Sequence, residues 1–63
     1  MNLLTRIEAA SFLHISVANI DRLRKRGELA CIRIGKRVFY AEIHLIAFVN
    51  SRVVPVKTDG GEK

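Results

Sequence analysis

Seven basic side chains fall within sixteen residues, between positions 22 and 37, and the same stretch holds a single acid, Glu28. Guanidinium and ammonium groups carry a lasting positive charge and several N–H donors, so a cluster of this density suits the binding of phosphates. The 63-residue chain as a whole has a net charge of +5 and a pI near 10.2, which is typical of small domains that bind polyanions. The seven bases are Arg22, Arg24, Lys25, Arg26, Arg33, Lys36 and Arg37.

Other reactive side chains do not form a pattern for catalysis or metal binding. Asp21 and Glu42 are scattered rather than paired, and a chain this short rarely encloses a catalytic pocket. Cys31 is the only cysteine, and His14 and His44 are far apart, so neither an internal disulfide nor a zinc site is predicted. We therefore expect a protein with no catalytic residues, no metal, no cofactor and no small-molecule substrate.

Composition indicates one folded domain in a reducing compartment. Hydrophobic residues make up 49% of the chain and charged residues 27%, a balance typical of globular proteins. No stretch approaches the roughly 18 apolar residues of a membrane-spanning helix, and the N-terminus lacks the pattern of a secretion signal. We expect a cytoplasmic protein that does not enter a membrane.

A first short helix is predicted from about Arg6, because Thr5 and Glu8 have the spacing of a capping box. Ile7 and Ala10 are expected on its buried side. The helix is then interrupted near His14, and histidine accepts a left-handed backbone better than most residues other than glycine.

A second helix is predicted after Ser16, which is a preferred N-cap, and Gly27 is expected to end it. Ile20 and Leu23 form its core face. The opposite face is polar and mostly basic, with Ala18, Asp21, Arg22 and Lys25, and with Asn19 and Arg26 at its margin. Two short helices joined by a turn of about three residues form the outline of a helix-turn-helix.

A β-hairpin is predicted next, with strands over residues 29–34 and 37–41. A two-residue loop of Gly35 and Lys36 would pair Ile34 with Arg37. A three-residue loop would pair Ile34 with Val38. We expect the second register, because it gathers apolar side chains on one face, namely Ile32, Ile34, Val38 and Tyr40. In either register Lys36 lies at the tip, and Gly35 lets the backbone turn tightly and approach another surface.

A third helix is predicted over about residues 41–50, with Leu45, Phe48 and Val49 as its apolar stripe. Ile43 and Ile46 lie outside this stripe. Two interpretations remain open: these isoleucines contact another protomer or an integrase, or the segment VVPV that follows the helix folds over them. Residues 53–63 are expected to form a flexible tail, which leaves 1–52 as the folded domain.

The order helix, turn, helix, basic hairpin, helix resembles the excisionase-like branch of the MerR-type winged helix-turn-helix proteins. The resemblance runs from Leu3 to Val49 and rests on three segments, "LLTRIEAASFLHIS", "NIDRLRKRGEL" and "RIGKRVFY". It implies a small α+β winged helix-turn-helix with two short helices, a two-stranded hairpin wing and a C-terminal helix. It also implies a prokaryotic or phage-encoded protein that prefers certain sequences of double-stranded DNA, binds them cooperatively and bends them to promote integrase-mediated excision.

The resemblance assigns DNA contacts to two elements. The second helix would enter the major groove, with contacts from Ala18, Asn19, Arg22, Lys25 and Arg26. Asn19 is a candidate reader of adenine. The hairpin would contact an adjacent groove or the backbone through Arg33, Gly35, Lys36 and Arg37. The expected partners are duplex DNA, further copies of the chain and an integrase.

Two other functions fit the same residues. A small transcriptional regulator or the recognition part of a phage DNA-packaging machine would keep the fold and the DNA contacts. A protein-interaction module would instead use the apolar third helix as its working surface, and it would have little affinity for DNA.

Overall fold

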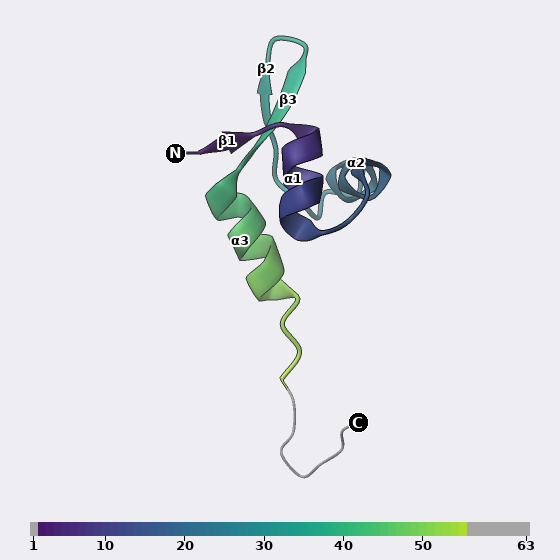
Figure 1. The fold of residues 1–63 in the computed structure, drawn as a ribbon, viewed down its shortest axis with the longest axis vertical. Helices are drawn as coiled ribbons and strands as arrows, with labels where there is room; N and C mark the ends of the chain where they lie inside the picture. The colour runs from purple at the N-terminus through teal and green to yellow at the C-terminus, as the bar shows by residue number, and fades with distance from the viewer. Residues whose placement is uncertain (1, 56–63) are drawn as a thin grey trace.

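The structure, a computed structural model, describes residues 2–55 (Figure 1). The described chain forms a small α+β winged helix-turn-helix, as the sequence predicted. Its elements, in chain order, are β1 (Leu3–Leu4), α1 (Arg6–Leu13), α2 (Val17–Lys25), β2 (Ile32–Ile34), β3 (Arg37–Ala41) and α3 (Glu42–Ser51). Of the tail predicted at 53–63, residues 56–63 lie outside the described part of the chain.

Local hydrogen bonds begin and end α1 where the sequence predicted. The Thr5 hydroxyl accepts from the backbone N–H of Glu8 at 3.1 Å, and the Glu8 carboxylate accepts from the N–H of Thr5 at 2.9 Å. His14 ends the helix with φ of 59°, in the left-handed region. Because an α-helix cannot continue through a left-handed residue, the chain turns here toward α2.

The second helix is also limited by its own sequence. The Ser16 hydroxyl accepts from the N–H of Asn19 at 3.1 Å, which caps the N-terminus of α2. After the helix, Gly27 has φ of 77°, so the predicted glycine stop is confirmed. The turn between α1 and α2 contains His14, Ile15 and Ser16, and its three residues agree with the predicted length.

The core joins all three helices to the sheet, and small residues at its centre let α1 approach α2 closely. Ile7 does not belong to it. Its side chain is 70% exposed, because α1 packs through its alanines and turns Ile7 outward. Val49 is exposed as well, because the last turn of α3 extends past the ends of α1 and α2 (Figure 1). The buried apolar residues are Ala9, Ala10, Ile20, Leu29, Tyr40, Ala41 and Leu45.

The hairpin has the two-residue loop of Gly35 and Lys36. The register that we expected, with a three-residue loop, is wrong. Ile34 pairs with Arg37, and Gly35 has φ of 59° while Lys36 does not have a positive φ, as in a type II′ turn. This turn matches the right-handed twist of the strands, and the twist decides the register over the tidier apolar pattern. Val38 therefore faces the core, whereas Ile34 lies exposed on the outer face.

The N-terminal strand was not predicted. Leu3 pairs with Ala41 and Leu4 with Tyr40, so β1 adds a third antiparallel strand beside β3. Two residues are too few to show an alternating pattern, and only the pairing partner makes them a strand. We call the hairpin of β2 and β3 the wing. β1 anchors the start of α1 beside the base of this wing.

Candidate nucleic-acid interface

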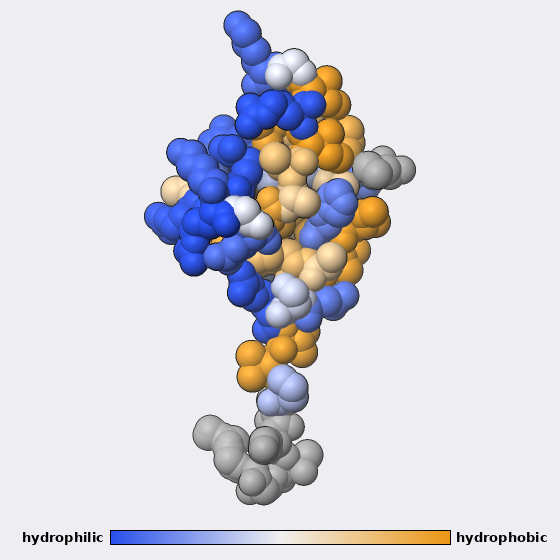
Figure 2. Space-filling view, turned by 180° about the vertical axis from the view of Figure 1, so that it is seen from behind, coloured by the Kyte–Doolittle hydropathy of each residue, from blue (hydrophilic) through white to orange (hydrophobic). Residues whose placement is uncertain are grey.

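The exposed face of α2 carries most of the side chains that the sequence assigned to DNA contact. Ala18, Arg22, Lys25 and Arg26 are exposed, and Asn19 is half-buried. A shallow hollow of about 430 Å³ runs between the exposed residues and Asp21. Hydrophilic residues gather on the side of the molecule that holds α2 (Figure 2). α2 thus presents a basic, solvent-facing surface, with the small residue Ala18 near its N-terminus.

Polar contacts within this face divide its bases into free and paired ones. The Arg22 guanidinium donates to the side-chain oxygen of Asn19, so the candidate adenine reader and another predicted major-groove contact lie together. Arg26 is paired with the carboxylate of Glu28 at 2.9 Å. Among residues 2–55, neither Arg22 nor Lys25 has a carboxylate within ion-pair distance. Arg22 and Lys25 are therefore the bases of α2 with most charge available to a ligand.

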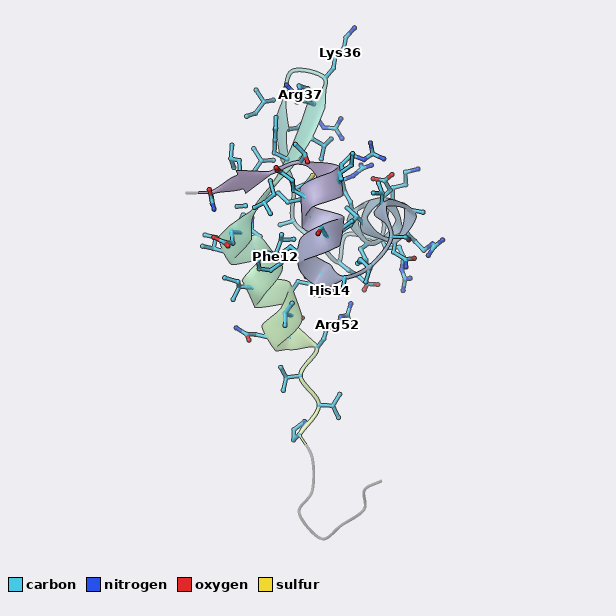
Figure 3. All side chains as sticks on the ribbon, in the orientation of Figure 1. Phe12, His14, Lys36, Arg37 and Arg52 are labelled. Carbon is cyan, nitrogen blue, oxygen red and sulfur yellow. The ribbon has the colours of Figure 1, made fainter. Side chains whose placement is uncertain are left out.

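The tip of the wing carries Lys36, whose side chain points away from the body of the protein (Figure 3). Behind it, the Arg37 guanidinium lies 5.1 Å from the centre of the Phe39 ring. A Cβ added at Gly35 would meet nothing within 4 Å, so glycine is needed there for its backbone conformation rather than for space. The register places Arg33 and Arg37 on opposite faces of the wing. The wing contacts predicted from the sequence therefore split between its tip and two faces.

An open cleft of about 610 Å³ separates the wing from the helices. Its walls hold four bases and one acid, and two of the bases, Arg6 and Arg24, were not predicted as site residues. The lining residues are Thr5, Arg6, Ile7, Asp21, Arg24, Lys36, Arg37, Val38 and Phe39. This cleft joins the face of α2 to the wing and makes one continuous basic surface.

Asp21 is the acid of this cleft, and it binds two arginines. It accepts from Nε and Nη2 of Arg6 at 3.0 and 2.8 Å, and Arg24 lies at 3.8 Å. The hydrogen bond from Arg6 lowers the pKa of Asp21 below its ordinary value, against a partial opposing effect of burial. The same hydrogen bond raises the pKa of Arg6. No local spacing relates positions 6 and 21, so the sequence carried no signal for this pair.

Tyr40 follows two cleft residues, Val38 and Phe39, in β3 and is fully buried. Among the described residues, neither its hydroxyl nor the buried Nε of Arg24 has a hydrogen-bond partner. Burial raises the pKa of Tyr40, and the neighbouring Arg24 side chain, first as a nearby hydrogen-bond donor and then through its positive charge, opposes this rise. The Arg24 side chain therefore lies beside the Tyr40 hydroxyl as well as in the wall of the cleft.

A second exposed surface lies on α3. Ile43 is 58% and Ile46 is 46% exposed, so both stand outside the core as predicted. Val53 and Val54 are exposed too, and the described chain runs away from the body after α3 (Figure 1). The interpretation that the tail covers the two isoleucines is therefore wrong for residues 53–55. Figure 2 shows hydrophobic residues along this side, opposite the hydrophilic one.

Within the described part of the chain, no helix is long and apolar enough to cross a membrane. No curated protein and no solved structure matches this sequence. Residues 3–53 match the family model of the helix-turn-helix domain, and the match covers both helices of the motif, the wing and α3. The chain therefore belongs to the helix-turn-helix domain family, whose fold and exposed second helix serve DNA binding.

Proposed function

We propose that this protein is a sequence-preferring duplex-DNA-binding factor of the excisionase type, which binds cooperatively, bends DNA and promotes excision by an integrase. One observation carries the proposal: the exposed face of α2 and the tip of the wing are joined by a basic cleft into one surface. The excisionase role is supported by the resemblance of the sequence to that branch of winged helix-turn-helix proteins. In this role the protein catalyses no reaction itself and works in the cytoplasm of a prokaryote.

On duplex DNA, α2 lies in the major groove. Ala18 allows a close approach, while Asn19 and Arg22 face base edges, where paired amide and guanidinium groups discriminate bases. Lys25 and Arg26 then reach the phosphates at the rim. The contact between Asn19 and Arg22 limits their freedom before binding, which reduces the entropy lost on recognition.

The wing contacts the neighbouring backbone or minor groove through Lys36 and Arg37. The tight turn at Gly35 lets this tip enter a narrow space, and lysine and arginine suit a groove of strong negative potential. One short helix and one wing bury little surface, so a single copy binds weakly. Several copies on neighbouring sites supply the affinity that one copy lacks.

The DNA-binding part of the proposal is tested by fluorescence anisotropy of a labelled generic duplex, titrated with the protein across a salt series. Each phosphate contact contributes about −0.9 to the slope of log affinity against log salt. A slope of roughly −4 to −6 is expected if helix and wing both contact the backbone. An absence of binding at low salt would contradict the proposal.

The excision role needs a separate experiment. The protein is added to the integrase of its own genetic element and a DNA substrate that carries both recombined attachment sites. Adding the protein should increase the yield of excision. The increase should be smaller with Arg22→Ala, a variant that lacks one positive charge of α2. DNA binding without stimulated excision would favour the alternative of a transcriptional regulator.

Exposed isoleucines on α3 favour protein contact as a second activity of the same molecule. Ile43 and Ile46 are exposed on α3, which lies on the other side of α1 from α2 (Figure 1), so a partner seated there would leave DNA contact by α2 undisturbed. Another copy of the chain or an integrase are the partners that the excision role requires at this surface.

A further inference from the structure

We propose that the cleft between the wing and α1 is a binding site for one phosphodiester group of the DNA backbone, with Arg6 as its principal side-chain ligand. The inference rests on the proposed DNA binding and adds to it a site at the start of α1, a helix from which the sequence predicted no DNA-contacting side chain. It concerns only the charged backbone, so this site contributes affinity without reading bases.

The charges around the cleft favour an anion. Arg6, Arg24, Lys36 and Arg37 line it and come from α1, α2 and the wing, against the single carboxylate of Asp21. Four positive charges and one negative charge leave an excess of three positive charges. Because the cleft is open to solvent, a phosphate on an extended strand can enter it without unfolding any element.

Arg6 is already oriented for this contact. Its Nε and Nη2 donate to Asp21 at 3.0 and 2.8 Å, which holds the planar guanidinium in place. The remaining nitrogen, Nη1, keeps its donors for another acceptor. A guanidinium held by a carboxylate loses less freedom on binding than a free side chain does, so this arrangement strengthens the contact with phosphate.

The backbone at the start of α1 supplies further donors beside Arg6. The Thr5 hydroxyl accepts from the N–H of Glu8, which leaves the N–H groups of Arg6 and Ile7 without an acceptor inside the helix. Thr5, Arg6 and Ile7 all line the cleft. Together with the positive end of the helix dipole, two free amides beside an arginine favour a bound phosphate.

Arg24 supplies a second guanidinium to the wall of the cleft. Its Nε is buried and lies near the Tyr40 hydroxyl. Asp21 lies 3.8 Å from its Nη2, too far for a hydrogen bond. A phosphate in the cleft would bring acceptor oxygens and a negative charge to the terminal nitrogens of this guanidinium, with which Asp21 makes no hydrogen bond.

The position of the cleft agrees with the course of a DNA strand. Figure 3 places Lys36 and Arg37 on the wing above the start of α1, with α2 beside α1. A strand that leaves the major groove at α2 and passes under the wing tip crosses the cleft. The site then contacts the phosphate between those held by the helix and by the wing.

Arg6→Ala, compared with Arg52→Ala, tests this site. Both arginines are half-exposed, with 47% and 55% of the side chain accessible, and both pair with a carboxylate. Arg52 lies at the far end of α3, away from the wing (Figure 3). The two variants therefore remove the same charge from different places.

The measurement is the salt dependence of binding to a generic duplex. Arg6→Ala should make the log–log slope less negative by about 0.9, the effect of one lost phosphate contact, whereas Arg52→Ala should keep the slope of the unmodified protein. Equal slopes for Arg6→Ala and the unmodified protein would overturn the phosphate site while leaving DNA binding intact. If the unmodified protein does not bind DNA, the proposed function itself fails.

A second readout does not depend on the folding of a variant. In the unmodified protein, the backbone amide NMR signals of Arg6 and Ile7 should shift when the duplex is added and should return when salt displaces it. Unchanged amide signals at both positions, alongside shifts on α2, would overturn the site.

Discussion

Asp21 accepts two hydrogen bonds from Arg6, at 3.0 and 2.8 Å, and so ties the middle of α2 to the start of α1. The pair lies in the cleft between the helices and the wing, where the other charged side chains are basic. One carboxylate thus lies at the centre of the surface that we assign to DNA. It holds Arg6 in place and at the same time repels phosphates.

The repulsion can be measured with Asp21→Asn. Asparagine keeps one acceptor oxygen for Arg6 and removes the negative charge. Affinity for a generic duplex at low salt should rise roughly threefold, the effect of one charge at about 7 Å in water. The control is Glu42→Gln, which removes a charge at the start of α3 and should have a smaller effect. A fall in affinity with Asp21→Asn would show that Asp21 acts mainly by orienting Arg6.

Arg37→Ala tests the wing. This variant should weaken binding to all duplex sequences alike and make the salt slope less negative by about 0.9, because a phosphate contact carries no sequence information. Arg37→Lys serves as the control, since it keeps the charge and loses the planar stacking on Phe39. Altered sequence preference with unchanged overall affinity would contradict the assignment of the wing to the backbone.

Gly35→Ala should destabilise the wing without creating a clash. The residue has φ of 59°, and an added Cβ would meet nothing within 4 Å, so the whole cost is conformational. That cost is about 1 kcal/mol, or about 4–8 °C in Tm for a domain of this size. Thermal unfolding followed by circular dichroism measures it. An unchanged Tm for Gly35→Ala would contradict this explanation.

Tyr40→Phe should leave the stability at neutral pH unchanged or raise it by up to about 1 kcal/mol, because it removes a buried hydroxyl that has no hydrogen-bond partner among the described residues. A fall of more than that amount would show that the hydroxyl has a bonded partner.

The two proteins should differ in alkali. Burial raises the pKa of Tyr40 above its ordinary value of 10.0, so above that pH the unfolded chain loses the proton before the folded chain does. Below pH 10 the ionisation of Tyr40 should therefore not reduce the free energy of unfolding of the unmodified protein. As the pH rises from there through the pKa of the folded protein, this free energy should fall. A Tm series across this range, run on both proteins, should show an extra loss only where Tyr40 is present.

Ile46→Glu tests α3 as a protein-contact surface. Ile46 is 46% exposed, so the variant should fold with nearly unchanged Tm. If copies of the chain or an integrase bind here, cooperativity on DNA with repeated sites should fall, because a charge is then buried at the contact. Val53→Glu, at an exposed position beyond α3, is the matched control. Retained stability together with retained cooperativity would remove the case for this surface.

The ends of the helices could be predicted from the sequence because local contacts decide them. The capping box of Thr5 and Glu8 spans three residues, and the left-handed residues His14 and Gly27 act through their own backbone. Such features depend on the preferences of a few neighbouring residues, so they appear in the chain before any packing does. The basic face of α2 followed in the same way from helical spacing.

Tertiary structure decided the features that join distant positions. The pairing of Ile34 with Arg37 followed the twist of the hairpin rather than its apolar pattern, and β1 exists only beside β3. The pair of Arg6 and Asp21 depends on how α1 packs against α2, which no spacing along the chain encodes. Local residue preferences therefore determined the ends of α1 and α2 and the basic face of α2. Packing determined which charges meet in the cleft, because side chains fifteen residues apart become neighbours only when the core closes.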